Sequence, residues 1–419
     1  MRVLHLAQFY APIIGGEERH VASISKALAA RGHEVEVATL AHPDRPAVMT
    51  DRDVTVRSLT GWSQRAGRLF SDDQRRHAPP FPDPGLTAAL AKIVSRFRPD
   101  VVHGHNWLVH SFLPLKPTAG AALVMTLHDY GLVCAKKTMM RAGALCAGPS
   151  LARCLPCAKG HYGTAVGGVT TLGNRVSSLF ERRAVDRFVA VSAAVAELCG
   201  LTTGATPYDV LPTFVPDDVA TLGPVDARLE ELPDHDFILY VGDLNRNKGV
   251  GVLLDAYRNL GPGVPPLVLI GRRCADMPDE LPANVLVRES WPHAAVMHAW
   301  SRCLFGIAPS VWPEACGTIV MEGHAVGKPM IASDIGGLSD LVAHDQTGLL
   351  VPPGDVAALA AAMRALLDDP PRRAAMGVAA RTRAETFMAK SIIPRIERVY
   401  VEALGTRTAP RSALDEVTP

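Results

Sequence analysis

Two glutamates, Glu314 and Glu322, flank the start of a predicted helix. We expect Gly317 and Thr318 to form the turn and the N-cap of this helix. The helix is expected to end at Gly327 and to be stopped by Pro329. Backbone N–H groups at a helix start lack intrahelical partners and can bind phosphate. Because carboxylates accept hydrogen bonds from hydroxyls, one glutamate could contact a ribose and the other a hexose. The segment predicts a sugar-nucleotide site; the alternative is a helix with solvated acids.

Length and composition limit the classes of protein to consider. A chain of 419 residues exceeds the usual size of one core, which predicts two domains. The 43 basic and 42 acidic side chains nearly cancel, so nothing global calls for a nucleic acid partner. The first residues do not resemble a signal peptide, and no apolar run is long enough to span a membrane. A cytoplasmic protein is therefore expected.

Short apolar runs alternate with helical patterns along the chain, which predicts two parallel α/β sheets. The first sheet is expected to use Arg2–Ala7, Glu34–Leu40, Val54–Ser58, Val101–Gly104, Leu123–Leu127, Phe188–Val191 and Tyr208–Leu211. The second is expected to use Phe237–Val241, Leu267–Ile270, Val285–Val287, Leu304–Ile307, Pro329–Ala332 and Gly348–Val351.

A two-proline segment between the two sets of strands predicts a semi-rigid linker and the domain boundary. The expected domains are residues 1–212 and 213–387, followed by a helix over 388–405 and a polar tail over 406–419. The stretch from Gly61 to Gly85 is predicted to be a long loop, bearing Arg65, Arg68, Arg75, Arg76 and His77. Leu172–Asp186 is predicted to be an amphipathic helix; a solvated charged face is favoured over membrane contact, which stays open.

In open parallel sheets, ligands bind beyond the carboxyl ends of the strands, so the loops there carry the candidate residues. Gly15 and Gly16 follow the first strand and allow close approach to a backbone, although they lack the spacing of a dinucleotide motif. His128 follows the fifth strand, where a structural role is the alternative. Arg246 and Lys248 follow the first strand of the second sheet and could neutralise a diphosphate.

Taken together, these motifs make the chain resemble a family 4 retaining glycosyltransferase. The resemblance implies the GT-B fold, in which two Rossmann-like domains face each other across a cleft and a C-terminal helix crosses back to the first domain. It covers nearly the whole chain and rests on Gly15-Gly16-x-Glu18, Gly32-His33, His128-Asp129, Gly242 with Lys248-Gly249, Ala308-Pro-Ser310-x-Trp-Pro-Glu314, Glu322, Gly327-Lys-Pro, Gly336-Gly337 and Thr347-Gly-Leu-Leu-Val-Pro-Pro-Gly354.

The resemblance also implies roles for individual residues. Glu322 would bind the ribose hydroxyls and Glu314 would lie at the donor hexose near its 3-hydroxyl, with a role in the chemistry that is unsettled. Lys248 would stabilise the departing phosphate, and His128 would approach the donor sugar. The diphosphate and sugar would meet the amides of Gly317, Thr318 and Ile319, while Gly15 and Gly16 would line the phosphate and acceptor side. No metal would be needed for transfer, because basic side chains and helix starts supply positive potential.

One departure from the family pattern concerns the diphosphate. Many members have arginine directly after the glycine that corresponds to Gly242, whereas this chain has Asp243. Arg246 or Arg272 could compensate for this acid. Because of this acid, a catalytically silent partner protein that keeps the fold is a further alternative to an enzyme.

Four cysteines, Cys134, Cys146, Cys154 and Cys157, lie close together after His128. Four thiolates could hold a structural zinc ion, as a similar pattern in a subset of the family implies, with free thiols or disulfides as alternatives.

The expected activity is transfer of a sugar from a UDP- or GDP-linked donor to an acceptor hydroxyl, and a sugar-nucleotide 2-epimerase is the second enzyme alternative. Sugars, lipid-linked sugars and small metabolites are all open as acceptors, and peripheral membrane contact also stays open.

Overall fold

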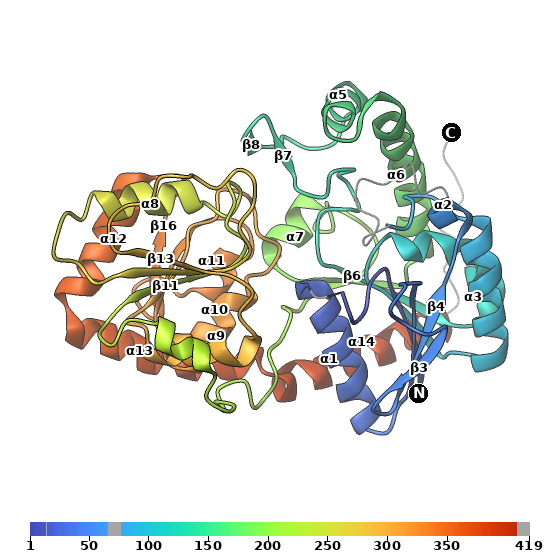
Figure 1. The fold of residues 1–419 in the computed structure, drawn as a ribbon. Helices are drawn as coiled ribbons and strands as arrows, with labels where there is room; N and C mark the ends of the chain where they lie inside the picture. The colour runs from blue at the N-terminus through green and yellow to red at the C-terminus, as the bar shows by residue number, and fades with distance from the viewer. Residues whose placement is uncertain (14, 66–76, 409–419) are drawn as a thin grey trace.

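Two parallel sheets, one in each lobe of the molecule, organise the structure (Figure 1). The computed structural model describes residues 1–13, 15–65 and 77–408. The first sheet has the strand order β10-β9-β6-β5-β1-β2-β4-β3, in which only β3 is antiparallel to its neighbour. Its strands are β1 (Arg2–Ala7), β2 (Glu34–Leu40), β3 (Val48–Asp51), β4 (Val54–Leu59), β5 (Val101–Gly104), β6 (Ala122–Leu127), β9 (Arg187–Ala190) and β10 (Tyr208–Val210).

The second sheet is parallel throughout and has the order β13-β12-β11-β14-β15-β16. Its strands are β11 (Ile238–Val241), β12 (Leu267–Ile270), β13 (Val285–Arg288), β14 (Gly306–Ala308), β15 (Met330–Ser333) and β16 (Gly348–Val351). The α/β fold with two facing lobes is the predicted one. Every strand predicted from an apolar run is present, with ends within about two residues, as is usual for such boundaries.

Helices cover both faces of each sheet and enclose the apolar cores. In the first lobe, α1 (Gly16–Ala30) and α14 (Ala389–Thr408) pack on one face, and α3 (Pro84–Phe97) and α7 (Ala193–Leu198) on the other. In the second lobe, the sheet is covered by α8 (Val250–Arg258), α9 (His293–Arg302), α10 (Thr318–Ala325), α11 (Leu338–Leu341), α12 (Val356–Asp368) and α13 (Pro370–Ala384).

The C-terminal helix α14 crosses back to the first lobe, as predicted. Ile392, Ile396 and Tyr400 are buried in the core that α1 shares with the first sheet. The returning chain runs beside the outgoing one: Val215 N–H donates to the Phe387 carbonyl at 3.0 Å. Helix α14 continues to Thr408, so the polar tail does not begin at residue 406, and residues 409–419 lie outside the described range.

Three local features of the structure differ from what the sequence led us to expect. The expected loop from Gly61 to Gly85 contains a short helix, α2 (Trp62–Arg65), and the beginning of α3, whose N-cap Asp83 accepts hydrogen bonds from two backbone N–H groups. Of the basic residues expected in that loop, Arg68, Arg75 and Arg76 lie outside the described residues. The strand β3 and the small hairpin of β7 (Met140–Arg141) and β8 (Ala144–Leu145) were not expected, because short exposed strands carry no apolar run.

The third difference concerns a helical hairpin that follows β8. It consists of α5 (Leu151–Tyr162) and α6 (Thr164–Ala184) and stands at the top of the first lobe in Figure 1. The predicted helix over Leu172–Asp186 is confirmed, but it begins at Thr164 and ends at Ala184. Its solvent face carries large apolar side chains beside Arg175 and Arg183, rather than charged side chains alone. Within the described ranges, none of the helices combines the length and apolar character needed to cross a membrane.

Candidate functional site

Strand order brings Lys248 and Glu314, two predicted site residues, to the same place in the structure. Strands β11 and β14 are neighbours, so the loops after them meet at the same edge of the second sheet. Gly249 lies at this crossing with φ +74°, and a Cβ there would come 1.9 Å from the Pro309 carbonyl oxygen. Only glycine permits both the left-handed backbone and this close approach. The turn thereby places Lys248 against Glu314.

The Glu314 carboxylate is held by three donors on one oxygen. Its Oε1 accepts from Lys248 Nζ at 2.6 Å, Ser310 Oγ at 2.6 Å and Trp312 Nε1 at 3.2 Å. The Glu314 side chain is only 9% exposed, so this charge is compensated where water has little access. Among the described residues, every hydrogen bond to the carboxylate ends on Oε1, which leaves Oε2 for a ligand hydroxyl.

A glycine pair supports this loop from behind. The Gly337 N–H donates to the Glu314 carbonyl at 2.6 Å. A Cβ at Gly336 would come 2.4 Å from the same carbonyl oxygen, and one at Gly337 would come 2.4 Å from the Ala315 carbonyl oxygen. The pair therefore packs against the backbone of the Glu314 loop and fixes its position.

Helix α10 begins at Thr318, one residue earlier than the predicted N-cap at Thr318 would place its start. The N-cap is Gly317, which provides no side-chain hydrogen bond, so the first N–H groups of α10 are not capped by a side chain. Farther along the helix, Glu322 is buried and its Oε1 contacts His293 Nε2 at 2.8 Å. The site therefore combines uncapped amides with an oriented carboxylate, as an anionic ligand with hydroxyls requires.

The unusual Asp243 has a partner in the structure. Its Oδ2 accepts from Arg272 Nη2 at 2.7 Å, and this contact raises the pKa of Arg272. Arg272 therefore compensates the charge of Asp243 directly. Arg246 is exposed, and its backbone N–H donates to Asp276 Oδ2 at 3.0 Å. Of the two arginines, Arg272 is engaged with Asp243, while no hydrogen bond within the described residues occupies the Arg246 guanidinium.

On the first lobe, His128 ends a hydrogen-bonded row of histidines. His5 Nδ1 contacts His105 Nε2 at 2.9 Å, and His105 Nδ1 contacts His128 Nε2 at 3.0 Å. These residues lie in β1, after β5 and after β6, and the three strands are neighbours in the sheet. We call His5, His20, His103, His105 and His128 the histidine cluster.

The histidine cluster is uncharged at neutral pH. Burial lowers the pKa of His5 and of His128 to about 3, and burial with neighbouring histidines lowers the pKa of His105 well below its usual range. His128 therefore offers a neutral imidazole rather than a cation. His103 bonds Tyr400 Oη at 2.7 Å and Thr126 Oγ1 at 2.7 Å, so α14 also anchors the cluster.

Gly15 is the N-cap of α1, and Gly16 is its first residue. A Cβ on Gly15 would come 2.2 Å from Glu18 Oε2, whereas the corresponding space at Gly16 is open. Burial raises the pKa of the neighbouring Glu17 to about 8, although Lys137 opposes this shift. Glu17 accepts a short hydrogen bond from Asn106. The loop thus adds a carboxyl group whose pKa lies above its usual range.

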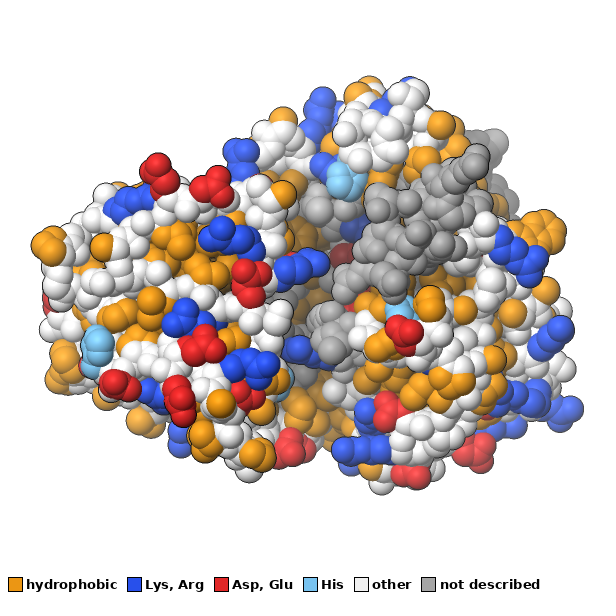
Figure 2. Space-filling view, in the orientation of Figure 1, with side chains coloured by type: hydrophobic (Ala, Val, Ile, Leu, Met, Phe, Trp, Pro, Cys, Tyr) orange, Lys and Arg blue, Asp and Glu red, His pale blue; other side chains and the backbone are white. Residues whose placement is uncertain are grey.

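The two lobes contact each other beside Glu314. Tyr130 Oη donates to the Pro313 carbonyl at 3.0 Å, and the Ala193 N–H donates to Asp340 Oδ2 at 2.7 Å. Figure 2 shows the surface hollowed between the lobes, with Lys and Arg side chains near its rim. The loop that carries Glu314 therefore lies where the lobes meet.

The four clustered cysteines all have free thiols. In the described chain, the single group of three or more potential metal ligands whose atoms lie within 4.8 Å of one another is His5, His103 and His105. The cysteine sulfurs are thus not gathered into a tetrahedral set here, and the structural zinc ion stays a prediction. The histidines already exchange hydrogen bonds with protein groups, which favours a network over a metal centre.

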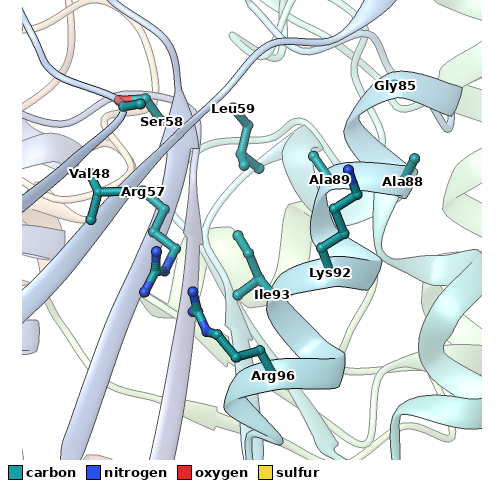
Figure 3. Close-up of a pocket in the computed structure, with 11 residues that line it drawn as sticks. Val48, Arg57, Ser58, Leu59, Gly85, Ala88, Ala89, Lys92, Ile93 and Arg96 are labelled. Carbon is teal, nitrogen blue, oxygen red and sulfur yellow. The ribbon is translucent and has the colours of Figure 1, made fainter.

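A separate cavity of about 500 Å³ lies between β4 and α3, away from these residues (Figure 3). Arg57 and Arg96 line it, and both pair with Glu36 at 2.7 Å. Their charges are therefore compensated within the protein. None of the predicted site residues lines this cavity.

Comparison with known families identifies the chain. The model described as Glycosyltransferase Family 4 matches residues 14–219, and the model described as Glycosyl transferases group 1 matches residues 226–383. An α-maltose-1-phosphate synthase of Mycolicibacterium smegmatis is 32% identical over 54% of this chain and 67% of that protein. The chain belongs to the family 4 glycosyltransferases. This glycosyltransferase is also 28% identical to a glycogen synthase of Mycobacterium tuberculosis, over 99% of this chain and 98% of that protein.

Solved structures confirm the GT-B fold of the glycosyltransferase. Sucrose-phosphate synthase of Thermosynechococcus elongatus matches with a TM-score of 0.74 and 21% identity over 97% of this chain and 99% of that one. Anabaena HepE in complex with UDP-glucose matches with a TM-score of 0.66 and 19% identity over 97% and 100% of the two chains.

Several side chains around the candidate site were not predicted from the sequence. Ser310 and Trp312 could have been found, since they stand in the same motif as Glu314. The row of histidines also had a signal, because His103 and His105 alternate at a strand end. His293 had no such signal, because it lies 29 residues from Glu322.

Proposed function

We propose that the glycosyltransferase moves a sugar from a UDP- or GDP-linked donor to an acceptor hydroxyl with retention of the anomeric configuration. The observation that carries this proposal is the contact of Lys248 with Glu314 beside the uncapped start of α10. This contact brings together the Lys248 cation, a Glu314 carboxylate that can accept hydrogen bonds from hydroxyls, and the uncapped backbone N–H groups of α10. A nucleoside diphosphate sugar has the complementary groups.

The donor would lie with its diphosphate over the amides of Gly317, Thr318 and Ile319. Negative charge grows on the diphosphate as the bond to the anomeric carbon breaks, and groups that bind this charge more strongly in the transition state accelerate the step. Lys248 is suited to this role, and the Arg246 guanidinium is the second candidate. Arg272 is a weaker candidate than the sequence indicated, because it already pairs with Asp243.

The sugar and the ribose would be held by carboxylates. Glu322, oriented by His293, would accept hydrogen bonds from the ribose hydroxyls. Glu314 would use Oε2 for the hexose near its 3-hydroxyl, while its Oε1 stays with Lys248. His128 would meet the donor sugar from the first lobe as a neutral hydrogen-bonding group, and Gly15 and Gly16 would line the phosphate and acceptor side.

For retention, the acceptor oxygen would attack the anomeric carbon from the face that the diphosphate leaves. The bond from this carbon to the diphosphate breaks, and the acceptor proton passes to a leaving phosphate oxygen. Lys248 and the helix start supply positive potential, so we propose that no metal ion is required for this step. The zinc ion at the cysteine segment would be structural only.

A donor panel tests the proposed function. Purified protein is incubated with UDP- and GDP-linked sugars and with sugar, lipid-linked and small-metabolite acceptors, and nucleotide release and the product anomer are measured by NMR. Transfer with the donor configuration retained supports the proposal, and an inverted product refutes retention. An epimerised donor would instead identify a 2-epimerase, and nucleotide binding without turnover a silent partner.

The sequence relatives and the fold neighbours support a nucleotide sugar as the donor. The Anabaena structure holds UDP-glucose, and the glycogen and maltose-phosphate synthases make sugar polymers or phosphorylated sugars by name. These proteins differ in acceptor, so their names do not select one for this chain. We propose a cytoplasmic enzyme that uses a cytoplasmic nucleotide sugar.

A further inference from the structure

Helix α6 is amphipathic in the opposite sense to an ordinary surface helix. Its buried face is polar and small, comprising Gly167, Thr170, Thr171, Asn174, Ser177, Ser178 and Glu181. Its solvent face carries five large apolar side chains that are each 51–58% exposed: Val169, Leu172, Val176, Leu179 and Phe180. We call these five residues the outer face of α6. A soluble surface helix normally buries the apolar stripe instead.

Specific contacts fix α6 in this orientation. Ser178 Oγ donates to the Leu132 carbonyl at 2.7 Å, and Glu181 Oε2 pairs with His110 Nε2 at 2.8 Å in a buried position. Turning the helix over would bury the apolar residues but would break these contacts and leave polar groups without partners. The outward direction of the apolar stripe is therefore built into the packing of the lobe.

The charge around α6 selects an anionic partner. Residues 130–184, which include both helices of the hairpin, contain eight basic side chains and one acidic one, although the whole chain is nearly neutral. The single acid, Glu181, is buried and paired with His110. The exposed basic residues are Arg141, Lys159, Arg175 and Arg183. The surface of this segment is thus apolar and basic, without an exposed acid to repel anions.

We propose that the outer face of α6 docks this protein on the surface of a membrane with anionic lipids. An exposed apolar stripe flanked by cations is the pattern of a helix that lies in the lipid interface without crossing it. Figure 1 shows the α5–α6 hairpin protruding from the top of the first lobe, so a flat surface can reach it. This inference concerns location and not the reaction, and it stands or falls independently of the proposed activity.

Vesicle co-sedimentation tests the proposal with the full chain. The wild-type protein is expected to bind vesicles of mixed phosphatidylcholine and phosphatidylglycerol. Its affinity for pure phosphatidylcholine vesicles should be lower by about tenfold or more, because each basic side chain near an anionic surface contributes to the attraction. Added salt should weaken the binding to anionic vesicles. No binding of the wild type to either vesicle would overturn the proposal.

Two variants separate the apolar and basic parts of the surface. The double variant Leu179→Ser with Phe180→Ser should lose at least tenfold in vesicle binding, since both side chains insert in the interface. Arg175→Ser with Arg183→Ser should weaken binding about tenfold on anionic vesicles only. Val378→Ser is the matched control, because Val378 is 72% exposed on α13 of the other lobe, and it should bind as the wild type does.

The same variants exclude a different occupant. Circular dichroism and thermal unfolding should be unchanged in the Leu179 and Phe180 variant, because both side chains are exposed. A wild-type dimer in sedimentation velocity that this variant abolishes would show that a second copy covers the face, and would overturn the membrane proposal. Vesicle binding that survives this variant undiminished would overturn it as well.

Discussion

Replacing Lys248 by methionine tests the charge proposed to act on the leaving diphosphate. The substitution keeps most of the apolar stem but removes the ammonium group 2.6 Å from Glu314 Oε1. Breaking a fully buried ion pair costs about 3–5 kcal/mol. Here the Lys248 side chain is 32% exposed, and Ser310 and Trp312 still donate to the same oxygen. We therefore expect a smaller loss of folding stability, about 1–2 kcal/mol.

The expected effect on turnover is larger than the effect on stability. Removing one group that stabilises developing negative charge lowers kcat by about 10²–10³. Single-turnover rates with the identified donor, measured on protein that denaturant titration shows to be folded, give the two losses separately. Ser310→Ala is the matched variant, since it removes a hydrogen bond to the same oxygen without removing a charge. We expect it to lower kcat by less than about tenfold.

A second control examines the loss of a lysine as such. Lys390→Met removes an exposed lysine that pairs with Glu385 at the start of α14, and kcat should be unchanged. The reasoning about Lys248 fails if Lys248→Met turns over within about threefold of the wild type, or if Ser310→Ala is equally slow, because the charge would then not be the decisive property.

Glu322→Ala should weaken nucleotide binding by about tenfold or more, because hydrogen bonds to charged groups contribute about 1.5–3 kcal/mol; isothermal titration that gives unchanged affinity would reject the ribose contact. In a denaturant titration, Gly249→Ala should lower the free energy of unfolding by about 3 kcal/mol, because φ is positive and the new Cβ would clash with Pro309. Gly251→Ala is the control in the same titration; a Cβ at Gly251 in α8 meets open space, so this variant should be neutral or stabilising. Burial lowers the folded-state pKa values of the histidine cluster, so its contribution to the free energy of unfolding is full above about pH 6.5 and falls as the pH drops towards 3. The expected loss is up to about 1.4 kcal/mol per pH unit for each histidine. A free energy of unfolding that is flat from pH 7 to 5 would contradict the lowered pKa values. Metal analysis of protein purified without added metal should find one zinc ion per chain if the four clustered cysteines bind it, and a folded metal-free preparation would exclude this ion.

The strands of both sheets were predictable because parallel strands are buried on both faces and form short continuous apolar runs. Strand β12, with the sequence Leu-Val-Leu-Ile, is one example. Strand β3 was missed because it lies at the sheet edge, where Val48 is exposed and the strand ends in an acid. Such a strand has no apolar signal. Strand β3 forms by pairing with the edge of β4, and the sequence of β3 alone does not reveal this tertiary contact.

The residues of the candidate site were predictable as types in loops, but their partners were not. The contact of Glu322 with His293 depends on how α9 and α10 pack, and no local pattern contains that information. Helical periodicity likewise indicated that α6 has two unlike faces, but the orientation expected from it, with a charged face in solvent, did not anticipate the exposed apolar side chains. Burial of the Glu181 and His110 pair decided the observed orientation, and both side chains were ordinary polar residues in the sequence.

The hydrogen bond from Tyr130 to the Pro313 carbonyl has a spectroscopic consequence. It joins the first lobe to the residue between Trp312 and Glu314, so any rotation that separates the lobes must break it. The indole of Trp312 donates to Glu314 and lies 5.8 Å from Lys248 Nζ, and its emission depends on these polar neighbours. Trp312 is one of only five tryptophans, and its fluorescence should follow the movement of the lobes in real time without an added label.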